Sequence, residues 1–232
     1  MEELAEVARV ADLAEKLKAY RTSLAYSYCF LVWSSLMVGL PLIHTAIMFS
    51  PWFPAVRAYH VQMLFLVLAL GIATSLAIMF YLLVRMGIMG LPTPRTAAIA
   101  WPLSFSIPFA VVYGLISALG LFDLMPVAWW LAGGIAYTAV GLSVENALVR
   151  EKLLFARPFL LMGLLALATS VPGLHLALRE DECEYLIGGV LMWRWAAGPL
   201  SAMLLAGATH LLAAFLASFY TFLKAERAVF GP

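Results

Sequence analysis

The 232-residue sequence has few charged side chains. Asp, Glu, Lys and Arg make up 12% of it, whereas a soluble domain has about 25%. Hydrophobic residues make up 64% of the chain. A soluble fold cannot bury that much apolar surface, whereas a lipid bilayer can accommodate it. A net charge of +1, with no run of Lys or Arg, excludes a nucleic-acid partner. The composition therefore predicts an integral membrane protein.

Cysteines and enzyme motifs are also scarce. The two cysteines, Cys29 and Cys183, are predicted near opposite membrane faces, so we expect no disulfide between them. The sequence has no Gly-x-Ser-x-Gly, no His-Glu-x-x-His, no phosphate-binding loop and no Cys-x-x-Cys. These absences favour a non-enzymatic protein.

Long apolar runs predict an all-α fold with about six transmembrane helices. Each run is near the roughly 20 residues that a helix needs to cross a bilayer, and helices satisfy their own backbone groups in hydrocarbon. Residues rich in Pro, Gly or Asp separate several of the runs. The predicted spans are 24–49, 58–84, 97–121, 126–148, 158–178 and 196–223.

The positions of Lys and Arg predict the orientation. Eleven of the fourteen lie on the side of the two termini, and the other three are Arg57, Arg179 and Arg194. The excess of positive charge in cytoplasmic segments then predicts that both termini of this cell-membrane protein are cytoplasmic. An even number of spans leads to the same arrangement.

The ends of the chain are predicted to lie outside the membrane. Residues 1–22 are predicted to form a cytoplasmic amphipathic helix, with Val7, Val10, Ala14 and Leu17 on one face. This helix could lie along the membrane or bind a cytoplasmic partner. Residues 23–225 then form a single six-helix transmembrane domain, and residues 226–232 a short cytoplasmic tail.

An acidic stretch follows the fifth predicted span. Glu180, Asp181, Glu182 and Glu184 gather four of the thirteen carboxylates within five positions, and we expect an outward-facing loop there. It could be a plain solvated loop or could attract a cation or a basic partner. The apolar residues 185–195 are too few to cross the membrane, and Trp193 and Trp195 favour its interface. They predict a short re-entrant or interfacial segment.

Three of the four histidines lie near the predicted outer face. His44 and His175 fall at similar depth in spans one and five, and two imidazoles at one depth could ligate a b-type haem. With His60, Asp181, Glu182 and Glu184 they could instead bind a metal. The alternative is that these histidines form hydrogen bonds with the backbone or with lipid headgroups.

Two ionisable residues fall inside predicted spans. His210 lies near the middle of span six, where a polar ring needs a partner, and Ser104, Ser106 and Tyr113 are candidates. Glu145 lies near the cytoplasmic end of span four. It could pair with Arg150 or Lys152, or it could act as a gate or partner contact. These are the candidate functional polar residues in the membrane.

Three functions remain open on the sequence. The first is a transport or translocation subunit for a small solute or ion, working alone or with a partner. The second is a b-type haem or quinone-linked anchor subunit of an electron-transfer complex. The third is a structural or assembly subunit. Besides the lipid bilayer, other membrane or cytoplasmic subunits or further copies of the chain are expected as partners.

The predicted orientation can be tested at the two cysteines. A membrane-impermeant maleimide added to intact cells should label Cys183, in the outward segment, and leave Cys29 unlabelled, as measured by mass spectrometry. A Cys183→Ser variant should lose the label. Labelling of neither cysteine, although the denatured protein reacts at both, would contradict the predicted orientation.

Overall fold

Six long helices make up most of the chain. The computed structural model describes residues 2–48, 55, 57–86, 95–179, 182–187 and 190–231. In these residues, six helical segments are long and apolar enough to span a membrane, as the sequence predicted. The helices are α1 (Glu2–Met48), α3 (His60–Arg85), α4 (Arg95–Ala118), α5 (Met125–Val140), α7 (Pro158–Ala177) and α8 (Ala197–Phe230). The segment that begins with α5 continues through a π-helical turn (Gly141–Glu145) into α6 (Asn146–Arg150).

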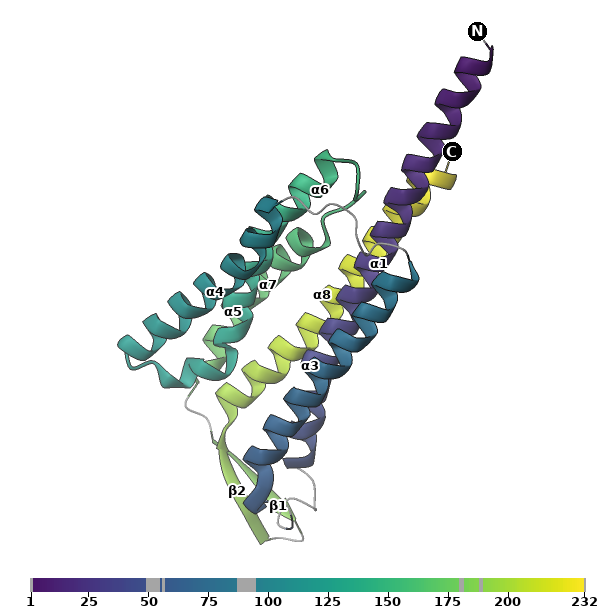
Figure 1. Ribbon diagram of the computed structural model, residues 1–232. Coiled ribbons are helices and arrows are strands. Elements are labelled where there is room, and N and C mark those ends of the chain that lie inside the picture. Colours follow the sequence, from purple (N-terminus) through teal and green to yellow (C-terminus); the bar gives the residue numbers. More distant parts are fainter. Residues whose placement is uncertain are drawn as a thin grey trace.

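Helix α8 lies in the middle of the bundle (Figure 1). Both α1 and α7 pack along it, and α5 packs on α7 and also reaches α8. The outermost helices are α3, which packs mainly on α1, and α4, which packs mainly on α5. Both termini lie at the same end of the molecule (Figure 1).

The N-terminal residues do not form a separate helix. Helix α1 runs without a break from Glu2 to Met48, so the predicted element 1–22 is the first part of a longer one. No Gly or Pro occurs before Gly39 to interrupt it, and Lys16 Nζ lies 2.8 Å from Asp12 one turn earlier. At about 1.5 Å per residue, 47 residues span about 70 Å. Helix α1 is therefore much longer than a membrane crossing requires.

The chain beyond the fifth span forms a β-hairpin, and the prediction that residues 185–195 are re-entrant or interfacial stays a prediction. Strand β1 (Glu182–Ile187) pairs antiparallel with β2 (Val190–Ala196), and Glu184 is opposite Arg194 in the register. In the sequence, Gly188-Gly189 separates two runs rich in aromatic and branched residues, a pattern typical of a two-residue hairpin. The acidic residues Glu182 and Glu184 are thus in a strand. Glu180 and Asp181 lie outside the described residues.

Glycines let α5 and α7 approach closely. A Cβ at Gly163 of α7 would overlap the Oγ1 and backbone nitrogen of Thr138 on α5, and a Cβ at Gly141 would overlap the backbone of Leu160. A Cβ at Gly134 would lie 3.1 Å from the Ala166 methyl. Small residues allow this kind of close packing between helices in a membrane.

Aromatic side chains fill the space where α1, α4, α5 and α7 meet. The ring of Phe159 contacts Phe30 at 4.7 Å, Trp101 at 5.1 Å, Tyr137 at 5.6 Å and Tyr26 at 5.7 Å between centroids. Edge-to-face pairs at such distances stabilise a core beyond simple burial. Residues from four helices therefore share one core around Phe159.

A reciprocal pair of hydrogen bonds joins α1 to α8. The Ser27 hydroxyl donates to the Ser218 carbonyl oxygen at 3.2 Å, and the Ser218 hydroxyl donates to the Ser27 carbonyl oxygen at 3.2 Å. Both serines are buried. The pair fixes how α1 and α8 lie along each other, because both bonds require Ser27 and Ser218 to be side by side.

The close approach of α5 and α7 predicts opposite effects for two substitutions in α7. Gly163→Ala should destabilise the protein, because an added methyl costs about 1–3 kcal/mol where it meets a backbone that cannot move aside. Gly173→Ala is the matched control: nothing lies within 4 Å of its Cβ, and helix propensity favours Ala by about 1 kcal/mol. Thermal unfolding in detergent should give a lower Tm for Gly163→Ala only. A Tm for Gly163→Ala at or above that of Gly173→Ala would contradict the packing.

Candidate functional site

Several ionisable side chains are buried within the membrane-length helices, and two of them, Glu145 and His210, are the candidate functional residues from the sequence. Glu145 is 0% exposed and His210 is 2% exposed. Such residues are rare inside membrane helices, and they usually serve a structural or functional purpose. Their surroundings differ, so each is described in turn.

The position of Glu145 follows from a π-helical turn. Residues 141–145 form one wider turn between α5 and α6, and such turns change the register of the side chains that follow. Gly141, at its start, packs directly on Leu160. Glu145, at its end, therefore lies beside the beginning of α7.

The carboxylate of Glu145 caps α7. The backbone N–H of Phe159 donates to Oε1 at 2.9 Å, and that of Leu160 donates to Oε2 at 3.1 Å. The first amides of a helix have no partner within it, and Pro158 at the first position has no N–H. The positive end of the helix dipole also favours a carboxylate there. One side chain thus accepts hydrogen bonds from the two N–H groups of the first turn that have no partner within the helix.

Other elements complete the surroundings of this carboxylate. Tyr26 of α1 and Arg157, just before α7, both lie close enough to interact electrostatically with Glu145. The buried Tyr26 hydroxyl has no hydrogen bond of normal geometry among the described residues. Arg150 and Lys152, the partners predicted from the sequence, are exposed. Glu145 is therefore held by the backbone of α7, and the prediction of a pairing with Arg150 or Lys152 is wrong.

His210 lies among aromatic rings. Its imidazole is 5.2 Å from the ring of Trp130, 5.6 Å from Trp129 and 6.1 Å from Tyr137, between centroids. Neither ring nitrogen has a hydrogen-bond partner among the described residues. The predicted partners Ser104, Ser106 and Tyr113 therefore form no hydrogen bond with it. Here the name aromatic box denotes Trp129, Trp130 and Tyr137.

The aromatic box is itself held in place. The indole N–H of Trp130 donates to Thr169 Oγ1 of α7 at 2.9 Å, and Tyr137 contacts Phe159. Tyr137 contacts His210 on one side, and Phe159, on the other, carries the amide that Glu145 binds. Packed side chains thus connect Glu145 and His210.

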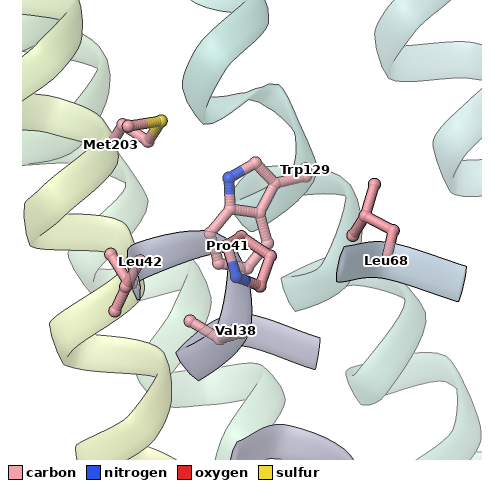
Figure 2. A pocket seen from close by; sticks show the side chains of 7 residues that line it. Val38, Pro41, Leu42, Leu68, Trp129 and Met203 are labelled. Atoms are coloured by element: carbon pink, nitrogen blue, oxygen red, sulfur yellow. The ribbon is translucent and has the colours of Figure 1, made fainter. Parts of the chain in front are cut away.

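A cavity of about 250 Å³ adjoins the aromatic box. Its walls come from α1, α3, α5 and α8, and Figure 2 labels Val38, Pro41, Leu42, Leu68, Trp129 and Met203. The rings of Trp129 and Pro41 appear between Leu68 on one side and Leu42 and Met203 on the other (Figure 2). Gly207 also lines it. Trp129 therefore contacts both the cavity and His210.

The predicted haem ligands lie on two different helices. His44 is buried on α1, whereas His175 is exposed on α7, and α8 packs between these two helices. Two axial ligands of one haem would have to face each other across the same space. The two histidines thus lie on helices on either side of α8, and a haem site at His44 and His175 stays a prediction.

The side chains of the predicted metal ligands His60, Asp181, Glu182 and Glu184 are not among those that the structure describes. Among the residues that it does describe, no group of three or more His, Cys, Asp or Glu could hold a metal ion. Asp181 lies outside the described residues. His60 begins α3, and Glu182 and Glu184 are in β1, but only their backbone is described. A metal site at these residues stays a prediction.

Sequence reasoning missed the neighbours of both buried groups. Trp130 and Tyr137 are seven residues apart, which places them on one face of α5. The Arg157-Pro158 pair marked the start of α7, where a carboxylate from elsewhere could bind. Both signals were present, but neither says which helix supplies the partner.

Comparisons of the chain with protein-family models, curated proteins and solved structures find no match. The class of the protein therefore comes from the structure alone. Six helices of membrane-spanning length and composition are the architecture of a multi-pass membrane protein.

The cap predicts a large effect at Glu145 and a small one nearby. Glu145→Ala should leave the amides of Phe159 and Leu160 buried and unsatisfied, at a cost of about 1–3 kcal/mol each. Glu145→Gln, which keeps one acceptor oxygen, should fall between Ala and wild type. The exposed Glu151, six residues later, is the control: Glu151→Ala should unfold like wild type. Equal unfolding temperatures for Glu145→Ala and Glu151→Ala would show that the cap does not stabilise α7.

Proposed function

We propose that the chain is a transport subunit of the cell membrane for a small solute or ion, with both termini in the cytoplasm. The distribution of Lys and Arg supports this orientation, as does the position of both termini at one end of the bundle (Figure 1). The apolar outer surfaces of α3 and α4 suit contact with lipid or with other membrane subunits.

The observation that carries the proposal is the imidazole of His210, which has no hydrogen-bond partner among the residues that the structure describes. A buried polar group without a hydrogen bond costs about 1–3 kcal/mol, and Leu or Phe would fill the same space without that cost. Ionisable residues kept inside membrane helices commonly mark the path of an ion, a proton or a solute. A use for His210 in transport gives a reason for its presence.

The chemistry of the aromatic box suits such a use. A neutral imidazole offers one donor and one acceptor, so His210 can exchange a proton or replace part of the water shell of a passing solute. The rings of Trp129 and Trp130, 5.6 Å and 5.2 Å from the imidazole between centroids, are close enough for cation–π attraction to a positive charge on it. Glu145 already binds α7, so its task in this proposal is to hold the helix that supports the box.

The proposal predicts that transport depends on His210 and not on its neighbour in sequence. Purified protein in liposomes that contain a pH-sensitive dye should pass protons when a potassium gradient with valinomycin sets the membrane potential. His210→Leu should lower that flux at least tenfold while the protein still folds. Thr209→Val is the matched control, because the Thr209 hydroxyl only bonds carbonyl oxygens of its own helix, at 2.7 Å and 3.1 Å. Equal flux through wild type and His210→Leu would contradict the role given to His210.

A further inference from the structure

The cavity beside Trp129 is partly open and has room for a small ligand. Its volume of about 250 Å³ exceeds the 150 Å³ or so of an engineered apolar cavity that binds benzene. Side chains from four helices line it, including Leu68 of α3 and Met203 of α8. Helix α3 packs mainly on α1, and at this cavity its Leu68 also lies close to residues of α5 and α8.

The lining excludes a charged ligand. The wall side chains are those of Val38, Pro41, Leu42, Leu68, Trp129 and Met203, none of which carries a charge. A charge placed against such a wall would lose its hydration free energy, and no side chain there could compensate with an opposite charge. The indole N–H of Trp129 is the one nitrogen or oxygen donor that these side chains offer, and no side-chain oxygen is among them.

The shape of the wall favours a ring. The Trp129 indole and the aliphatic ring of Pro41 both line the cavity and lie close together in Figure 2, and an aromatic ring packs well on an indole. Gly207 also lines the cavity and lets α8 pack closely on α1, because a Cβ there would lie 3.1 Å from Leu42 Cδ2. A ligand seated here would touch Trp129, whose ring contacts His210 at 5.6 Å.

We propose that this cavity binds an uncharged, lipid-soluble molecule with one or two fused rings and a single hydrogen-bond acceptor. The rings fill the apolar space between α1, α3 and α8, and the acceptor receives the Trp129 indole N–H. This site goes beyond the proposed transport function, because its ligand is uncharged and need not itself be transported. Binding is measured at equilibrium, without transport, so either idea can fail without the other.

The test uses two probes with the same carbon skeleton. 1-Tetralone has two fused rings and one ketone oxygen, and tetralin has the same rings without the oxygen. Equilibrium dialysis against the protein in phosphatidylcholine nanodiscs, corrected with empty nanodiscs, gives the Kd of each radiolabelled probe. Wild-type protein should bind 1-tetralone saturably and at least fivefold more tightly than tetralin. Trp129→Phe should remove this difference.

Two substitutions in α3 test the location. Leu68→Trp should fill the cavity and weaken 1-tetralone binding at least tenfold. Leu70→Trp is the matched control, because Leu70 is 54% exposed on the same helix and should bind like wild type. Gly207→Val, which fills the cavity from α8, should act as Leu68→Trp does and replaces it if that variant fails to fold.

Three results would overturn the assignment. The first is probe uptake no greater than that of empty nanodiscs. The second is equal binding by Leu68→Trp and Leu70→Trp. The third is a phospholipid that copurifies with wild type, is lost from Leu68→Trp and blocks 1-tetralone, because the cavity would then hold a lipid chain.

Discussion

The close approach of α5 and α7 is the contact on which the rest of the structure depends. Gly134, Gly141 and Gly163 remove the side chains that would separate the two helices, and the π-helical turn then directs Glu145 at the first amides of α7. A buried carboxylate is costly unless several hydrogen bonds satisfy it. Here the need of the carboxylate for donors and the need of the helix for an acceptor are met by the same two bonds.

The same contact positions the aromatic box. The indole N–H of Trp130 donates a hydrogen bond to Thr169 of α7, and Tyr137 packs on Phe159 of α7. Both rings are therefore held by the helix that Glu145 caps. These rings surround His210, which comes from α8 at the middle of the bundle. Glu145, which has a structural role, and His210, the proposed functional residue, are thus held by the same helices. A substitution at Glu145 should therefore shift the surroundings of His210 through the packed side chains between them.

The sequence predicted the six membrane-length helices, because long apolar runs alone decide their number. It did not predict the unbroken α1, since the change from polar to apolar composition near residue 22 looks like a boundary although nothing there ends a helix. The hairpin was missed because Trp193 and Trp195 were interpreted as interfacial residues, while Gly188-Gly189 indicated a turn. The sequence placed the ionisable residues Glu145 and His210 inside membrane spans. It did not predict their neighbours, because these come from other helices and local sequence does not show which helices pack together.

The central claim is that Glu145 supplies the acceptor for the first amides of α7. Amide hydrogen exchange measured by NMR, with Phe and Leu labelled by ¹⁵N, tests it residue by residue. We expect the amides of Phe159 and Leu160 to be protected in wild type and to exchange much faster in Glu145→Ala. The amide of Leu161, which donates to the Arg157 carbonyl oxygen at 3.2 Å, should stay protected in both. Fast exchange of Phe159 and Leu160 in wild type, or unchanged protection in Glu145→Ala, would contradict the account.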